Sequence, residues 1–166
     1  NNIYLDPEQR TEFEEIQFNI SGRTISVSLP LISQKILSGR GISRLMQDID
    51  SQLVKKGENS LFEGNYTAEF LNHILGDETH HTYGLAQQIA EYLGKVLGRI
   101  IYLVYQGNVL KRKGHAQWSK EDKALVKGTT HFVLGGSIGI KGRLAEIIQQ
   151  KATSYLFENY DLFVDL

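Results

Sequence analysis

A stretch near the carboxyl end, residues 130–150, constrains the fold of this chain more than any other. It runs THFVLGGSIGIKGRLAEIIQQ. Residues 131–134 have the apolar composition of a strand, Gly135, Gly136 and Gly139 interrupt it, and an amphipathic segment follows. The pattern predicts a strand, a glycine turn and a helix.

Paired glycines at the carboxyl end of a strand let a ligand approach the backbone where a Cβ atom would block it. The helix that follows turns its first unpaired N–H groups toward the same place. Such a corner suits a nucleotide. A tight strand-to-helix connection that binds nothing explains the glycines equally well.

Two common nucleotide motifs do not fit this corner. A Walker A loop requires Lys followed by Ser or Thr, whereas Lys141 is followed by Gly142. A dinucleotide fingerprint is spaced G-x-G-x-x-G early in a βαβ unit, but Gly136, Gly139 and Gly142 are spaced G-x-x-G-x-x-G near the end. Neither motif is therefore predicted.

Composition narrows the function classes. The chain has 166 residues, 41% of them hydrophobic, so a single domain spanning 1–166 with its own core is expected. The net charge of −1 gives no overall attraction to nucleic acid or to an anionic membrane.

The chain has no cysteine, which excludes disulfides, thiolate catalysis and cysteine-based zinc sites, and a reducing cytoplasm is the simplest setting. No apolar run approaches the roughly 18 residues of a membrane span, so no membrane partner is expected.

The first part of the chain predicts a hairpin and two helices. Apolar residues alternate with polar ones over 13–29, with a turn at residues 21–23. Pro30 is suited to open a helix over 31–37, and a second helix follows over 42–54.

The middle of the chain predicts two more helices. Thr67 is the expected N-cap of one that Gly76 ends, and Asp77 the expected cap of the longest helix, over 80–106. Gly94 and Gly98 lie one turn apart in it. Because glycine costs about 1 kcal/mol in a helix relative to alanine, the pair indicates that another backbone packs closely there.

The last segments complete the predicted fold class. The helix after the glycine corner extends to about residue 156, and residues 161–166 (DLFVDL) form a final short strand. A strand, a helix and a strand in this order imply parallel pairing through a right-handed crossover. Together with the hairpin, this predicts an α/β fold with a mixed sheet and packed helices.

The segment 107–128 is the most polar part of the second half. Its basic residues could contact phosphates or single-stranded nucleic acid beside Trp118, but Glu121 and Asp122 dilute the charge. A solvated hairpin or excursion is favoured, and nucleic acid is not an expected partner. The basic residues are Lys111, Arg112, Lys113, Lys120, Lys123 and Lys127.

Three histidines, His73, His80 and His81, raise a metal hypothesis. Adjacent histidines on a helix point about 100° apart, so they do not chelate one ion from one face. His115 and His131 stand alone and are expected to be structural. No metal site is predicted.

Four segments, in their order and spacing, resemble the ROK (repressor, ORF, kinase) group of sugar kinases and sugar-sensing regulators. Residues 38–45 (SGRGISRL) and 75–77 (LGD) resemble two helix starts of the group. Residues 90–101 (AEYLGKVLGRII) resemble its long helix, and 132–137 (FVLGGS) its adenosine motif. The resemblance covers about residues 29–166.

The chain also departs from the group. The ROK zinc motif needs several cysteines, so no zinc is expected, and the Gly-His sugar contact before it is not visible. The Asp-x-Gly phosphate loop, the catalytic Asp and the second glycine-rich phosphate loop have no counterpart. Segment 107–128 is an insertion relative to the usual short link. No catalytic residue is therefore assigned.

The resemblance implies the carboxyl-terminal lobe of an actin-like ATPase (ribonuclease H-like) fold, whose amino-terminal lobe would be its partner. ATP with Mg²⁺ is the implied cofactor. Gly135, Gly136 and Ser137 would lie beside adenosine, with Ile138 and Gly139 shaping the pocket. A sugar ligand and a homodimer are further partners that the resemblance allows.

Three functions stay open at this point. The first is ATP-dependent phosphoryl transfer to a hexose once both lobes are joined. The second is a non-catalytic sugar-sensing regulator or scaffold, which the missing cysteines favour. The third is an α/β interaction domain without a ligand.

Overall fold

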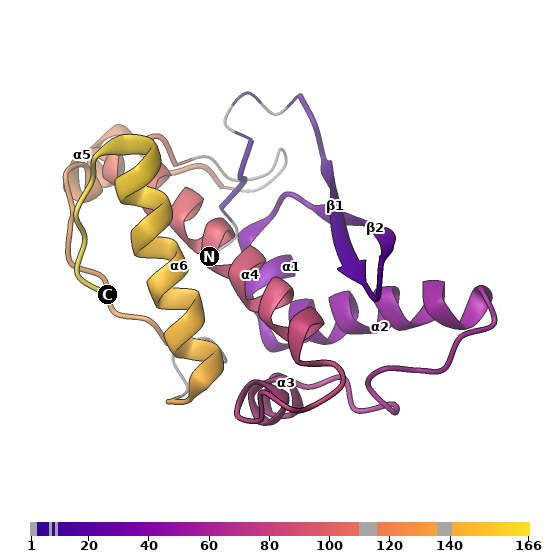
Figure 1. The fold of residues 1–166 in the computed structure, drawn as a ribbon. Helices are drawn as coiled ribbons and strands as arrows, with labels where there is room; N and C mark the ends of the chain where they lie inside the picture. The colour runs from indigo at the N-terminus through magenta and orange to yellow at the C-terminus, as the bar shows by residue number, and fades with distance from the viewer. Residues whose placement is uncertain (1–2, 7, 9, 110–115, 136–140) are drawn as a thin grey trace.

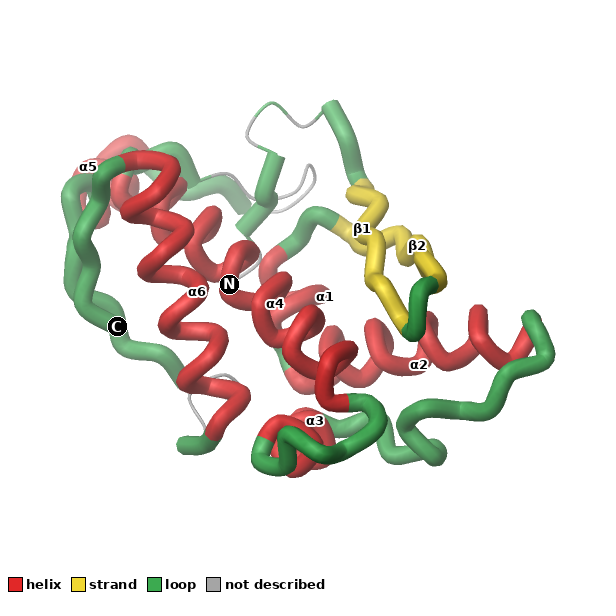
Figure 2. The backbone as a smooth tube through the Cα atoms, in the orientation of Figure 1, coloured by secondary structure: helices red, strands yellow, loops and turns green. Residues whose placement is uncertain are grey.

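The computed structural model describes residues 3–6, 8, 10–109, 116–135 and 141–166 (Figure 1). Within these residues it is a mixed α/β structure, as predicted, in which helices predominate over one two-stranded antiparallel sheet (Figure 2). The long helix α4 (Tyr83–Tyr105) runs through the middle, between α6 (Arg143–Tyr160) and the hairpin (Figure 1).

The hairpin consists of β1 (Phe13–Ile20) and β2 (Arg23–Pro30), with Ile20 opposite Arg23. The two turn residues are left-handed, with φ of 46° at Ser21 and 80° at Gly22. Such a two-residue turn matches the right-handed twist of the strands, so the local sequence suffices to form it. The predicted hairpin is confirmed.

The next three helices are α1 (Ser33–Leu37), α2 (Gly39–Lys55) and α3 (Ala68–Leu75). Only α3 begins where it was predicted to, after its cap Thr67. The prediction that Pro30 opens a helix is wrong, because Pro30 ends β2, and α2 begins at Gly39 instead of residue 42. The Ser38 hydroxyl accepts a hydrogen bond from the Gly41 N–H at 3.0 Å, and the Thr67 hydroxyl accepts one from the Phe70 N–H at 3.1 Å. Each bond satisfies an otherwise unpaired N–H of the first turn.

The predicted start of the longest helix is wrong. The Asp77 carboxylate accepts hydrogen bonds from the N–H and hydroxyl of Thr79, at 3.0 and 2.6 Å. This local bonding holds the chain in turns, and α4 begins only after Thr82. Asp77 is therefore a turn residue and not the cap of α4.

The predicted strands at 131–134 and 161–166 are also not formed as strands. One parallel bridge joins His131 to Asp165, with the Phe132 N–H donating to the Asp165 carbonyl at 2.9 Å. Val133 is fully exposed and Phe163 is 72% exposed, so the described chain offers neither segment a second neighbour that would extend the pairing. The parallel direction across α6 is as predicted, but its extent is a single bridge.

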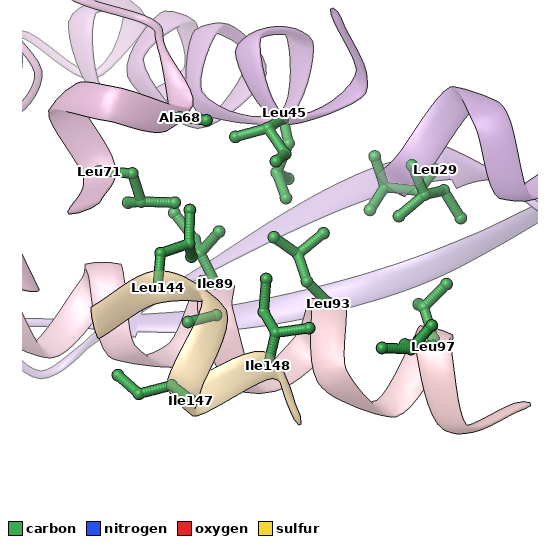
Figure 3. Close-up of a cluster of buried hydrophobic side chains, with 14 of the residues drawn as sticks. Leu29, Leu45, Ala68, Leu71, Ile89, Leu93, Leu97, Leu144, Ile147 and Ile148 are labelled. Carbon is green, nitrogen blue, oxygen red and sulfur yellow. The ribbon is translucent and has the colours of Figure 1, made fainter. Parts of the chain in front are cut away.

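The core lies where α4 meets the other helices. Figure 3 shows leucines and isoleucines of α2, α3, α4 and α6 gathered in one cluster, with Leu29 of the hairpin at its side. Burying each such side chain contributes about 1.5–3 kcal/mol relative to exposure. This packing fixes the position of α6 and therefore of its first turn.

Candidate functional site

The predicted nucleotide corner lies where the segment after His131 approaches α6. Gly135 is exposed, and a Cβ atom built on it would meet no heavy atom within 4 Å. Gly136, Ser137, Ile138 and Gly139 lie outside the described residues. The one described member of the predicted set is thus a bare backbone position beside open space.

The start of α6 is held by Asn72 of α3, which sequence reasoning missed. The Asn72 Oδ1 atom accepts a hydrogen bond from the Leu144 N–H at 3.0 Å. Gly142 precedes α6 with φ of 154°, and a Cβ atom on it would lie 2.5 Å from that same oxygen. The Leu144 N–H, in the first turn of α6, is therefore bonded to a side chain and is not free to bind a ligand.

Arg143 brings a positive charge to the first turn of α6. Its Nη1 lies 3.2 Å from the Glu146 carboxylate, and both side chains are partly exposed. The hydrogen bond that Arg143 donates to Glu146 is the largest cause of a raised Arg143 pKa, and the Tyr83 side chain acts in the same direction. The guanidinium is therefore permanently charged, and Arg143 immediately precedes Leu144, whose N–H bonds Asn72.

The histidines lie in a different setting from the one predicted. His80 and His81 precede α4 in the turns, and their rings stack with centroids 4.6 Å apart. The Thr82 N–H donates to His80 Nδ1 at 3.2 Å, so this nitrogen already has a role in the turn. Across the ranges that the structure describes, no three metal-ligating side chains are grouped.

The polar segment 107–128 contains a helix and not the predicted hairpin; no residue of this helix is buried, as expected of a solvated excursion. Helix α5 (Lys120–Val126) has a capping box, in which Ser119 and Asp122 bond each other's backbone N–H groups at 3.0 Å. Trp118 is half-buried against the core cluster, which removes it as an exposed platform for a base. Residues 110–115, with Lys111, Arg112, Lys113 and His115, lie outside the described part.

A groove that the sequence did not predict lies between β1 and α4. It has a volume of about 660 Å³ and reaches Tyr155 of α6. Arg99 Nη1 lies 2.8 Å from the Glu14 carboxylate along it, joining α4 to β1. Burial raises the pKa of Tyr92, and the nearby Glu14 carboxylate raises it further. The residues that line this groove come from segments about seventy positions apart, so periodicity gives no signal of it.

Comparison with protein-family models, with curated proteins and with solved structures finds no match to this chain. Among the described helices, none combines the length and apolarity required to cross a membrane.

Proposed function

We propose that this chain is the nucleotide-binding, carboxyl-terminal lobe of a ROK-like sugar kinase, with the actin-like ATPase fold. In this proposal, ATP with Mg²⁺ binds at the glycine corner, and phosphoryl transfer to a hexose takes place once the amino-terminal lobe supplies the catalytic Asp. No residue of this chain is assigned a catalytic role.

The observation that carries the proposal is the parallel bridge between His131 and Asp165 across α6. It brings two segments parallel to each other, with α6 between them in the chain, and in open α/β sheets of this connectivity ligands bind beyond the carboxyl ends of the strands. Gly135 lies at that end with open space on its Cβ side. An adenosine could therefore approach the backbone there, with Gly136, Ser137, Ile138 and Gly139 completing the shelf.

Arg143 adds support through charge. A guanidinium at the start of a helix favours phosphate oxygens, because the helix dipole and the side chain attract the same anion. In this proposal Glu146 holds Arg143 until a phosphate competes for it.

The alternative is a non-catalytic sugar-sensing regulator or scaffold of the same group. It is favoured by the complete absence of cysteine, since the ROK zinc motif cannot be formed. This alternative predicts a sugar response without phosphoryl transfer after the two lobes are joined.

Titration of the chain with Mg²⁺ and a fluorescent ADP analogue tests the proposal. Gly135→Val should weaken binding at least about tenfold while leaving the melting temperature unchanged, because the new side chain meets open space. Ser28→Val, which places the same side chain on the exposed face of β2, is the matched control. Absence of ADP binding at millimolar concentration, or equal binding by both variants, would contradict the proposal.

A further inference from the structure

The edge of β1 that faces away from β2 carries backbone groups that point out of the hairpin. The Leu31 N–H donates to the Glu12 carbonyl at 2.9 Å, which continues the register in which Phe13 lies opposite Pro30. Because antiparallel partners alternate between bonded and non-bonded pairs, odd-numbered β1 residues direct their N–H and C=O groups to the open edge. Glu15 and Gln17 are two such residues.

Gln88 of α4 shows what these outward groups bind. The Asn19 N–H donates to Gln88 Oε1 at 2.8 Å, and the Asn19 carbonyl accepts from Gln88 Nε2 at 2.7 Å. One side-chain amide thus supplies the acceptor and donor that a neighbouring strand would supply. The Gln88 amide therefore satisfies the outward backbone groups of Asn19. The outward backbone groups of Glu15 and Gln17 bond to no other described residue.

The groove of about 660 Å³ runs along this open edge. Its lining includes Glu15 and Gln17 on one side and, on the other, Tyr92 and Val96 of α4 with Tyr155 of α6. In Figure 1, β1 is the strand of the hairpin nearer to α6, and α4 passes between them. A chain added beside β1 would therefore lie over α4 and contact α6.

The charges of the groove are nearly balanced. Glu14 and Arg99 neutralise each other at 2.8 Å, and Glu91 and Lys95 carry opposite charges one helical turn apart. The Tyr92 hydroxyl is shielded from solvent and has no hydrogen-bond partner among the described residues. The groove therefore selects its occupant by backbone bonding and apolar contact more than by charge.

We propose that this groove binds an extended peptide strand, which pairs with β1 at Glu15 and Gln17 and places alternate apolar side chains over Tyr92 and Tyr155. A helix has no free backbone groups in its interior to complete such a ladder, whereas strand addition supplies an N–H and a C=O at every second residue. A two-stranded hairpin is also marginal by itself, and a third strand stabilises it. The inference does not depend on the proposed nucleotide site.

Residue-resolved amide exchange of the full chain by NMR tests the proposal. In the free protein, the Glu15 and Gln17 amides should exchange at least about tenfold faster than those of Ile16 and Phe18, which face β2. The probes are capped peptides of about eight residues, the length of β1, with valine at alternate positions. Binding should slow exchange at Glu15 and Gln17 about tenfold or more, with little dependence on salt.

Backbone chemistry supplies the decisive controls. N-methylation of the peptide on the bonding edge should abolish protection, whereas N-methylation on the other edge should not. Gln17→Pro removes one outward N–H and should abolish binding, while Ser28→Pro makes the same change on the far edge of the hairpin and should not. If either proline variant unfolds, the N-methylated peptides decide the question on the unaltered chain.

Several outcomes would overturn the proposal. The first is that no peptide protects any amide at millimolar concentration. The second is that N-methylation has equal effects on the two peptide edges. The third is that the Glu15 and Gln17 amides already exchange slowly in the free, dilute protein. Protection that increases with protein concentration alone would assign the groove to a second copy instead.

Discussion

Gly94 of α4 lies so close to Lys151 of α6 that a Cβ atom added at Gly94 would be 2.6 Å from the Lys151 Cβ atom. One turn later, a Cβ atom at Gly98 would lie 2.7 Å from the Tyr155 ring. The two glycines therefore let the helices pack nearly backbone to backbone, as the sequence predicted. This contact sets the position of the carboxyl-terminal segments relative to the rest of the molecule.

Gly94→Ala should destabilise the chain even though alanine favours helices by about 1 kcal/mol. The added methyl group must displace α6, at a typical cost of about 1–3 kcal/mol. Gly84→Ala is the matched control on the same helix, because its Cβ would meet nothing within 4 Å. Urea denaturation should show a loss for Gly94→Ala and no loss for Gly84→Ala; equal stabilisation by both would contradict the close packing.

Asp50→Asn should destabilise the chain by about 1–3 kcal/mol. Asp50 is 2% exposed and accepts hydrogen bonds from the Ser60 hydroxyl, from the Leu61 N–H at 2.8 Å and from the Tyr66 hydroxyl at 3.0 Å. An amide nitrogen cannot accept, so at least one buried donor would lose its partner. Asp48→Asn on the same helix removes only an exposed pair with Arg44 and should change the free energy of unfolding by about 0.5 kcal/mol or less. Denaturant midpoints measure both changes, and similar midpoints for the two variants would be inconsistent with this role of Asp50.

Asn72 and Gly142 should be energetically coupled. Asn72→Ala removes the cap on the Leu144 N–H and should cost about 0.5–2 kcal/mol. Gly142→Ala should cost more in the wild-type background than in the Asn72→Ala background, because its Cβ atom would lie 2.5 Å from Asn72 Oδ1. A double-mutant cycle by thermal and denaturant unfolding measures the coupling, and strict additivity would indicate that the two residues are independent.

Tyr160 should contribute to a loss of stability at alkaline pH. Burial raises its pKa to about 12, and the hydrogen bond with Tyr155 acts in the same direction. Because the folded state holds this proton more tightly, the contribution is complete below the unfolded pKa of about 10 and is lost as the pH rises toward 12. Tyr160→Phe should flatten part of this decline in unfolding experiments from about pH 9, below the unfolded pKa, to about pH 12, the folded pKa. Phenolate absorbance should show one fewer late-titrating tyrosine, and an unchanged profile would contradict the assignment.

Local sequence predicted the elements that depend on neighbouring residues. The hairpin turn at Ser21 and Gly22 and the cap at Thr67 formed as predicted, because each depends on backbone geometry and bonds within a few positions. The start of α4 was wrong for the same local reason, since Asp77 bonds Thr79 instead of a helical N–H.

The candidate site was predictable only in part. Gly135 is exposed beside open space, residues 136–139 lie outside the described part of the chain, and the nucleotide-binding role of all five stays a prediction. Asn72 at the start of α6 and Gln88 at the edge of β1 were not foreseen, because each contacts a segment about seventy positions away.

The sequence by itself determined the hairpin turn, the start of α3 and the close approach at Gly94 and Gly98. Only the tertiary structure decided which backbone groups remain open along β1 and how little the segments around His131 and Asp165 pair. The physical reason is that turns and caps are satisfied by nearby atoms, whereas the bonding of an edge depends on which distant segment packing brings beside it.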